Sequence, residues 1–403
     1  MTDSQDNKKL VLAFSGGLDT SFCVKYLNEQ GYHVHAVLVN TGGFSDDEIA
    51  ETEQRAKMLG VEHFEALNET QTYYQRCVRY LLFGNVLRNN TYPLSVSAER
   101  VFQALAIIRY AQRVGAGHIA HGSTGAGNDQ VRFDLIFTTL APDINVITPI
   151  RDLQLSRQEE VAYLRERGVT TSWEKARYSI NQGLWGTSVG GQETLTSDQA
   201  LPDEAYPSQL EREDSQTVAV RFEQGEPVAV DGTTHDDPVE AIRHLQRLAA
   251  PFAIGRDTHV GDTIIGIKGR VGFEAAAPLI LIKAHQLLEK HVLVKWQQYW
   301  KEQLANWYGM MLHEGQYLDP VMRNIEVFLE DTQRTVTGTV TVSLHPYRFT
   351  LVGVKSDFDL MQADFGQYGE MNRAWTGEDV KGFTKVLSTQ NKIWQRVNGG
   401  KDE

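Results

Sequence analysis

The stretch Ala13-Phe-Ser-Gly-Gly-Leu-Asp-Thr-Ser21 decides the fold. It ends the apolar run Leu10–Phe14, which predicts a strand, and opens Asp19–Gln30, which predicts a helix. Gly16 and Gly17 allow the backbone to approach a ligand closely and to adopt positive φ. Hydroxyl groups beside a helix N-terminus suit phosphate or pyrophosphate. A plain glycine-rich turn capped by serine is the competing interpretation.

The alternation of strand and helix continues for about 150 residues from this turn. The further expected elements are strands at His33–Asn40, Val61–Leu67, His118–His121 and Val146–Ile150, and helices at Ser45–Leu59 and Ser97–Val114. This order is typical of an α/β domain whose parallel sheet is joined by crossover helices. Such sheets bind ligands at the carboxyl ends of their strands.

The pattern changes after Gly168, which ends a helix opened by a capping box at Ser156 and Glu159. We interpret the remainder as an α+β region. Its expected parts are an irregular stretch at Trp173–Gln192, a long connection at Gln192–Ser215, hairpins at Thr217–Val230 and at Thr335–Val342 with Tyr347–Val354, a helix starting at Asp237-Pro238, and a last helix at Glu378–Val397.

Composition excludes several classes of protein. The chain has 403 residues, of which 41% are apolar and 23% charged, as in ordinary globular proteins. Its 52 acidic and 39 basic residues give a net charge of −13, which argues against nucleic-acid binding. Cys23 and Cys77 form no CxxC pair, so a Cys₄ or Cys₂His₂ zinc site is excluded and a reducing compartment is indicated.

The sequence also predicts a cytoplasmic protein without a membrane anchor. The first nine residues lack the apolar region of a signal peptide. The most apolar stretch, Ala275–Ile282, is too short to cross a bilayer.

A second constellation lies at His121-Gly-Ser-Thr-Gly-Ala-Gly-Asn-Asp-Gln-Val-Arg-Phe133, directly after an expected strand. Asn128, Asp129 and Arg132 place an amide, a carboxylate and a guanidinium together. A guanidinium binds a carboxylate with two hydrogen bonds, and an aspartate holds an ammonium group. The set therefore suits a zwitterionic amino acid, whereas an Asn-Asp turn with a surface ion pair is the plain alternative.

Both motifs resemble those of one family. Residues 15–21 resemble the pyrophosphate loop of ATP pyrophosphatases, and in this form that of argininosuccinate synthases. Residues 127–133 resemble the segment with which that family grips both of its amino-acid substrates. Segments 178–188, 232–235 and 265–270 are also similar, so the resemblance covers nearly the whole chain.

The resemblance implies an AMP-forming ligase of arginine biosynthesis. ATP would activate the ureido oxygen of citrulline as a citrullyl-adenylate, and aspartate would then displace AMP to form argininosuccinate. Mg²⁺ would be held through the phosphates, with no dedicated protein metal site. We expect a nucleotide-binding domain at 1–168, an α+β synthetase domain at 169–368, a C-terminal helix and tail at 369–403, and a homotetramer without nucleic-acid or membrane partners.

The resemblance also implies the roles of individual residues. Asn128 and Asp129 would act by positioning, with no side-chain nucleophile. The residues expected to bind ATP are Ala13, Phe14, Ser15, Gly16, Gly17, Leu18, Asp19, Thr20, Ser21, Val39, Arg100 and Gly122. Those expected to bind citrulline are Tyr92, Ser97, Asn128, Arg132, Ser179, Ser188 and Phe273. Those expected to bind aspartate are Thr124, Asn128 and Asp129.

Four positions depart from the family pattern. Ala126 replaces a lysine, Val96 a threonine, Phe273 a tyrosine and Gly261 a glutamate. The last two changes remove acceptors for the α-ammonium group of citrulline.

These departures leave alternatives open. Asp262 or Asp257 substitutes for the missing glutamate, or the substrate is an N-acylated citrulline whose amide carries no charge. A non-catalytic nucleotide-binding relative is a further interpretation, favoured by Ala126 and Gly261. A tRNA-modifying ATP pyrophosphatase is disfavoured by the acidic charge and the absence of paired cysteines.

Overall fold

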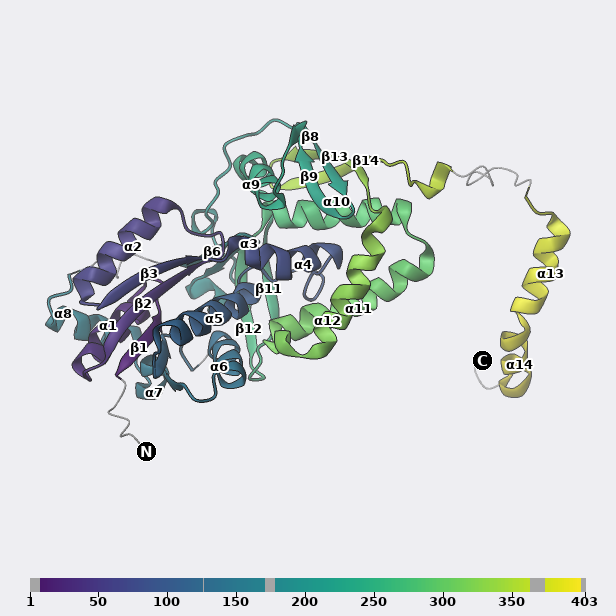
Figure 1. Cartoon of the computed structure of the whole chain (residues 1–403). Coiled ribbons are helices and arrows are strands. Elements are labelled where there is room, and N and C mark those ends of the chain that lie inside the picture. The colour runs from purple at the N-terminus through teal and green to yellow at the C-terminus, as the bar shows by residue number, and fades with distance from the viewer. Residues whose placement is uncertain (1–7, 126, 171–177, 363–373, 400–403) are drawn as a thin grey trace.

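The computed structural model describes residues 8–125, 127–170, 178–362 and 374–399. The first part of the chain forms a parallel sheet of order β3-β2-β1-β4-β5 (Figure 1). Its strands are β1 (Lys9–Ala13), β2 (His33–Asn40), β3 (His63–Asn68), β4 (His118–His121) and β5 (Asn145–Ile147). The chain therefore reverses its direction of winding at β1, and β1 and β4 lie side by side there.

Helices cover both faces of this sheet. They are α1 (Leu18–Glu29), α2 (Asp46–Leu59), α5 (Ser95–Val114), α6 (Asp129–Leu140), α7 (Pro149–Leu153) and α8 (Arg157–Glu166). Alternate residues of β1 point to opposite faces: Val11 packs in the cluster that contains α5, and Leu10 and Leu12 pack in the one that contains α1. The α/β fold predicted from the sequence is confirmed.

Local signals explain most helix ends. Ser45 and Glu48 form the capping box that starts α2, and Gly60 ends it at φ 91°. One expected strand was too long: β5 stops at Ile147, because Pro149 has a fixed φ and instead begins α7. Three short helical segments between β3 and α5 were not predicted, namely α3 (Thr70–Tyr73), the π-helix Tyr74–Val78 and α4 (Arg79–Phe83).

The second part of the chain holds two antiparallel sheets, of order β10-β9-β8-β13-β14 and β11-β12-β7-β6. The strands of the first are β8 (Gln216–Glu223), β9 (Glu226–Val230), β10 (Thr233–Thr234), β13 (Gly338–His345) and β14 (Arg348–Lys355). Those of the second are β6 (Ser179–Gly183), β7 (Gly186–Gly190), β11 (Arg256–Asp262) and β12 (Lys268–Glu274). Both predicted hairpins are confirmed within the first sheet.

The expectation of an irregular stretch at Trp173–Gln192 was wrong for its second half, while residues 173–177 lie outside the described ranges. β6 and β7 form a tight hairpin, and Trp185 in its turn is completely buried. The burial of Trp185 against other parts of the chain stabilises this hairpin. The polarity of the local sequence does not predict such a contact.

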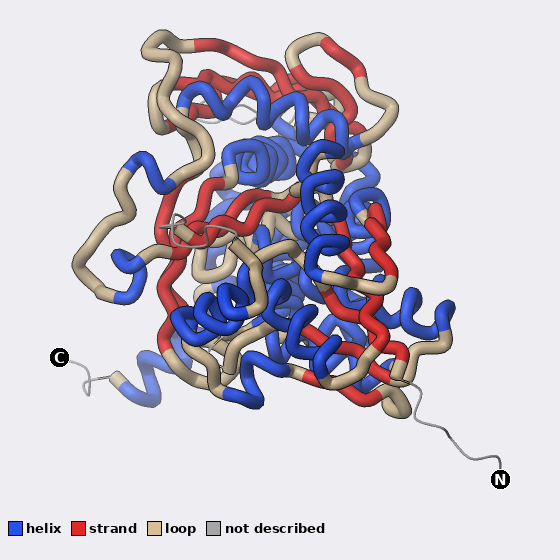
Figure 2. The backbone as a smooth tube through the Cα atoms, turned by 90° about the vertical axis from the view of Figure 1, so that its left-hand side faces the viewer, coloured by secondary structure: helices blue, strands red, loops and turns tan. Residues whose placement is uncertain are grey.

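The helices packed with these sheets are α9 (Pro238–Ala249), α10 (Ala276–Val292), α11 (Lys295–His313) and α12 (Pro320–Asp331). Figure 2 shows strands bordered by helices in both halves of the molecule. The helix α5 contacts β1, β2 and β4 on one side and β6 and β7 on the other, so it joins the two halves.

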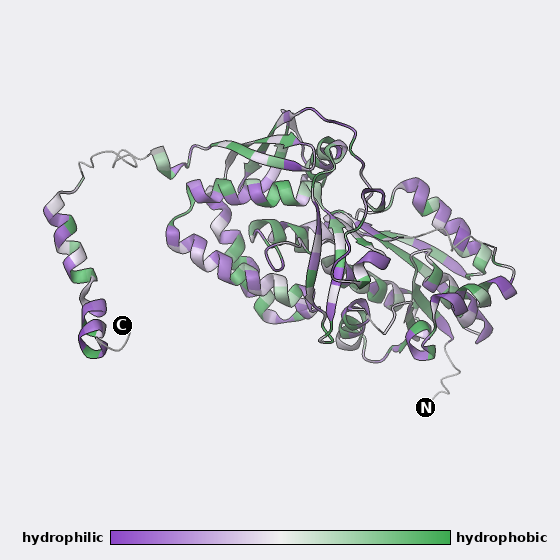
Figure 3. Ribbon diagram, turned by 180° about the vertical axis from the view of Figure 1, so that it is seen from behind, coloured by the Kyte–Doolittle hydropathy of each residue, from purple (hydrophilic) through white to green (hydrophobic). Residues whose placement is uncertain are grey.

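The single C-terminal helix expected at Glu378–Val397 is in fact two, α13 (Gly377–Leu387) and α14 (Thr389–Asn398). They divide at Ser388, whose hydroxyl donates to the carbonyl of Lys385 and so competes with the helical hydrogen bonds. Both helices lie apart from the rest of the chain (Figure 1), and neither has a buried residue. Figure 3 shows hydrophobic and hydrophilic residues interspersed along them.

Candidate active site

The turn between β1 and α1 is shaped by its own hydrogen bonds. Gly16 adopts φ 75°, and Gly17 is the N-cap of α1. The Ser21 hydroxyl and amide both donate to the Gly17 carbonyl, at 2.7 and 3.0 Å. Ser21 is completely buried, so it shapes the turn, whereas Ser15 is exposed on its outer side. The first N–H groups of α1 have no partner within the helix and are directed to this turn.

A neighbouring helix and loop enclose the turn. Arg55 of α2 donates to the Gly16 carbonyl at 2.5 Å. A Cβ atom added to Gly16 would lie 3.1 Å from the methyl carbon of Thr52, so this helix leaves little space for a side chain. On the other side, a Cβ added to Gly122 would lie 3.2 Å from the Cβ of Asp19. The loop after β4 therefore lies against the start of α1.

Four further residues expected to bind ATP are buried. Phe14, Leu18, Thr20 and Val39 are each at most 8% exposed, so any contact with nucleotide would use the backbone or the hydroxyl of Thr20. Thr124 is exposed in the loop after β4, and Ala126 lies outside the described residues.

A cluster of charges lies between α5 and α6. Asp129 begins α6, and its two oxygens accept from Arg100 Nε and Arg132 Nη1, each at 2.9 Å. Partial burial opposes ionisation of this carboxyl group, but the two guanidinium groups lower its pKa below the ordinary value. Asp129 is therefore a stable anion that positions its neighbours, and it is poorly suited to accept a proton.

Arg100 also connects this cluster to a buried glutamate. Its Nη1 lies 3.1 Å from Glu99 Oε1, and Glu99 Oε2 accepts from the Thr41 hydroxyl at 2.8 Å. Burial raises the pKa of Glu99 to about 7. Sequence reasoning missed Glu99, whose signal was a charged residue among the apolar positions of α5.

Arg132 has spare hydrogen-bonding capacity. Its Nε donates to the carbonyl of His313 at 2.9 Å, while its buried Nη2 has no partner among the described residues. The buried His313 Nδ1 also lacks one there. Buried polar atoms are normally satisfied, so these two atoms mark a place suited to a polar ligand.

The β11-β12-β7-β6 sheet brings the predicted serines to one face. Ser188 pairs with both Asn181 and Phe273, and Ser179 lies two residues before Asn181 on β6. Directly paired residues and residues two apart share a face of a sheet. Asn181 accepts from Arg100 Nη2 at 3.3 Å, which places this face against α5. Sequence reasoning missed Asn181 and the strand that carries it.

Tyr92 lies at the same face. Its ring stacks on His259 with centroids 5.2 Å apart and contacts Phe273 at 5.3 Å. Its hydroxyl accepts from the backbone N–H of Val96 at 3.2 Å, and Ser97 follows within α5. Asn128 accepts from the Ile264 N–H at 2.8 Å, which ties the tip of the β11–β12 hairpin to this region.

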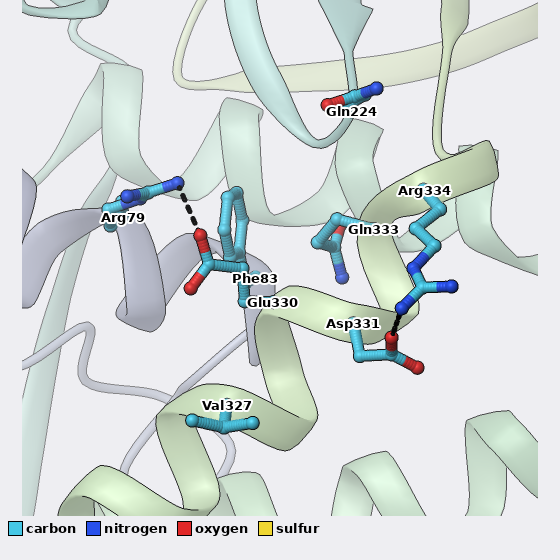
Figure 4. Close-up of a pocket in the computed structure, with 8 residues that line it drawn as sticks. All are labelled: Arg79, Phe83, Gln224, Val327, Glu330, Asp331, Gln333 and Arg334. Atoms are coloured by element: carbon cyan, nitrogen blue, oxygen red, sulfur yellow. Dashed lines mark hydrogen bonds and ion pairs between the residues drawn. The ribbon is translucent and has the colours of Figure 1, made fainter.

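A separate hollow of about 360 Å³ lies between α4, the hairpin turn at Gln224 and the end of α12 (Figure 4). Phe83 and Gln333 line it, and Arg79 pairs with Glu330 across it. None of the residues expected to bind substrates lines this hollow. Within the described ranges, no helix has the length and hydrophobicity needed to span a membrane.

Comparisons with known proteins agree with these motifs. The model of the arginosuccinate synthase N-terminal HUP domain matches residues 9–170, and that of the arginosuccinate synthase C-terminal domain matches residues 178–394. The argininosuccinate synthase of Methanocaldococcus jannaschii is 36% identical over 389 residues, which cover 96% of this chain and 97% of the relative. That of Xylella fastidiosa is 36% identical over 404 residues, covering 97% and 98%, and that of Dictyoglomus thermophilum is 33% identical over 399 residues, covering 98% and 99%.

The resemblance inferred from two short motifs thus extends over both halves of the chain and is confirmed. Because the matching models together span most of its length and the relatives are aligned almost end to end, the chain belongs to the argininosuccinate synthase family of ATP-dependent ligases.

Proposed function

We propose that this chain joins citrulline, or a derivative of it, to aspartate, while ATP is cleaved to AMP and pyrophosphate. One observation carries the proposal: the loop after β4 lies against the glycine turn, with Gly122 beside Asp19. The phosphate end of ATP and the charged cluster around Asp129 would then meet at one edge of the parallel sheet. Both amino-acid substrates must lie close to the α-phosphate for this chemistry.

In the first step, the ureido oxygen attacks the α-phosphorus and pyrophosphate leaves. This step needs in-line placement and charge stabilisation more than a nucleophilic side chain. The backbone N–H groups at the start of α1, together with the hydroxyls of Ser15 and Thr20, would stabilise the departing pyrophosphate. Arg55 holds the turn in position through the Gly16 carbonyl.

The residues beside the turn fit a Mg²⁺ ion carried by the phosphates. Asp19 lies next to Glu160 of α8, and burial, followed by the charge of Asp19, raises the pKa of Glu160 to about 8. Glu160 Oε2 is buried and has no partner among the described residues. A hard cation prefers ionised oxygen ligands. Glu160 holds a proton at neutral pH, so the phosphates would hold the ion, with Asp19 and Thr20 facing it. The ion would neutralise charge on the phosphates.

In the second step, the amine of aspartate attacks the activated ureido carbon and expels AMP. Thr124, Asn128 and Asp129 would hold aspartate, whose amine must arrive uncharged because Asp129 is a weak base. Arg132, through its free Nη2, and the other predicted citrulline residues (Tyr92, Ser97, Asn128, Ser179, Ser188 and Phe273) would hold the ureido substrate.

Pyrophosphate release tests the reaction directly. The purified protein is mixed with ATP, Mg²⁺ and aspartate, with or without citrulline or N-acyl-citrulline. We expect release that requires a ureido substrate, together with formation of AMP. No release in any mixture, with ATP still bound, would replace the proposal by the non-catalytic interpretation. Release stimulated by tRNA alone would favour the nucleic-acid alternative.

We also propose the domain limits 1–168, 169–368 and 369–403 and a homotetramer. Phe383, Leu387 and Trp394 are each at least 49% exposed on α13 and α14, and helices of this kind need an apolar partner surface. Light scattering after gel filtration would give the mass, and a Phe383→Asp/Trp394→Asp variant is expected to dissociate. Both cysteines are free and buried, which fits the cytoplasmic location expected from the sequence.

A further inference from the structure

One end of the site is formed by β11, β12 and the segment before α5. Aromatic rings, an imidazole and a glycine lie together there. His259 and Gly261 lie two residues apart on β11, so they share a face with Phe273, which pairs with Asp257. Tyr92 stacks on His259 and contacts Phe273 from the other side. Under the proposed function, this end receives the amino-acid part of the ureido substrate, beside Ser188.

The His259 ring occupies the space where a side chain at position 261 would begin. A Cβ atom added to Gly261 would lie 2.7 Å from His259 Nε2 and 3.4 Å from Asn89 Nδ2. An acidic side chain cannot be added there unless the ring moves. Burial of the ring, and then the nearby charge of Arg88, lower the pKa of His259 below its ordinary value, which favours the neutral imidazole.

Neither nearby aspartate is placed to replace a missing acid on this face. Asp262 pairs with Lys268 at 2.6 Å, is 63% exposed, and points away from the face that Gly261 shares with His259. Asp257 shares that face, but it is exposed and its Oδ1 accepts the Thr258 N–H at 2.7 Å. Neither aspartate therefore offers an α-ammonium group a buried carboxylate on this face.

Donors, in contrast, are available. The Arg88 guanidinium and the His259 ring have no hydrogen-bond partner among the described residues, and a neutral imidazole supplies one N–H donor. The charge of Arg88 acts on His259 and on His313, and Arg132 also acts on His313, so all four side chains share one neighbourhood. The charges of Arg88 and Arg132 disfavour an ammonium group here and favour carbonyl or carboxylate oxygens.

We propose that the α-nitrogen of the ureido substrate is acylated and uncharged, and that Arg88 donates to the acyl oxygen beside His259. The inference rests on the proposed function and specifies the substrate class for the same site. Phe273 provides a buried apolar wall at this end, which suits an acyl chain better than a charged amine.

The first experiment compares citrulline, Nα-acetylcitrulline and Nα-succinylcitrulline by pyrophosphate release, with the condensed product identified by mass. We expect kcat/KM for at least one acylated substrate to exceed that for citrulline by about tenfold or more, because a polar site rejects a mismatched group strongly. Higher kcat/KM for free citrulline would overturn the inference and leave the proposed function intact. Inactivity with all three would overturn the proposed function itself.

The second experiment uses variants of the chain. Arg88→Gln is expected to raise KM for the acylated substrate by about tenfold, with kcat nearly unchanged, because a charge-assisted hydrogen bond is lost. Arg243→Gln, on the surface of α9, is the matched control. An unchanged KM in Arg88→Gln would contradict the assignment of Arg88.

A third set separates the inference from the simplest alternative. If Asp257 or Asp262 holds an α-ammonium group, then Asp257→Asn or Asp262→Asn will raise KM for free citrulline by about tenfold. We expect no change in either variant. The double variant His259→Ala/Gly261→Glu, which opens the space and supplies the acid, should shift the preference toward free citrulline.

Discussion

The two ends of the candidate site are built in different ways. The phosphate end consists of one turn, residues 15–21, in which the Thr20 and Ser21 hydroxyls donate to the Gly17 carbonyl within the same seven residues. The ureido end is assembled from side chains on separate segments: Arg88 and Tyr92 before α5, His259 on β11 and Phe273 on β12. A local turn tolerates little variation, because each residue is needed for its shape. An assembled pocket can change one wall while the rest of the site remains.

The largest expected effect is a loss of kcat/KM on substitution of Asp129, which lies where the two ends of the site meet. Asp129→Ala leaves Arg100 and Arg132 close together without their shared anion. Removing one partner of a close charge pair costs about 2–5 kcal/mol, which corresponds to roughly 30- to 5,000-fold in kcat/KM. Steady-state pyrophosphate release measures this loss, and urea unfolding separates it from lost stability. Asp143→Asn, at an exposed position after α6, is the control, and equal activity of the two variants would contradict the role of Asp129.

The next largest expected effect is on KM for ATP, and it tests the phosphate end alone. Gly16→Val places a β-branched residue at φ 75°, close to Thr52, which costs about 1–3 kcal/mol of local strain. We expect KM for ATP to rise by about tenfold or more, while the binding of the ureido substrate is nearly unchanged. Gly232→Ala has a similar φ of 79° with open space around it and controls for strain alone. A Gly16→Val enzyme with normal KM for ATP would show that this turn does not bind the nucleotide.

A smaller effect is expected at the ureido end. Phe273→Tyr adds a hydroxyl to a completely buried ring that contacts Tyr92. An unpartnered buried hydroxyl costs about 1–3 kcal/mol of folding stability. Activity with free citrulline should change by less than about threefold, because one hydroxyl does not replace a carboxylate. If activity with free citrulline instead increases by about tenfold or more, this single substitution restores the family's substrate preference. The ureido end would then be as close to the family pattern as the phosphate end.

The last expected effect concerns the pH dependence of stability and not activity. The folded pKa of Glu99, about 7, lies above the value of 4.5 for an unperturbed glutamate. Between these values the folded chain holds a proton that the unfolded chain has released, so this group makes stability fall as pH rises from 4.5 to 7. The slope from one proton is at most about 1.4 kcal/mol per pH unit.

Glu99→Gln removes this contribution and provides the comparison. Urea unfolding of both proteins at several pH values should show a less negative slope for the variant between pH 4.5 and 7. The slope above pH 8 should be the same in both. Identical slopes across the whole range would show that Glu99 titrates as an ordinary exposed glutamate.

The same contrast explains what the sequence could predict. The parallel sheet followed from alternating apolar runs, and residues 15–21 and 127–133 identified the family because each motif is continuous in sequence. Glu99, Asn181 and His259 were missed because their importance depends on register and on contacts between distant segments. The β6–β7 hairpin was missed for a related reason, since Trp185 stabilises it through burial against other parts of the chain.

The position of α5 has a consequence for how the molecule unfolds. One helix contributes to the core of the parallel sheet and also supports the hairpin that carries Ser179 and Ser188. The two halves therefore cannot lose their structure independently, because separating them would expose the apolar surface of α5 to water. The amide hydrogens in its centre should be among the slowest to exchange with solvent. We therefore expect the two halves to unfold together as one cooperative unit, although they differ in sequence pattern and in chemistry.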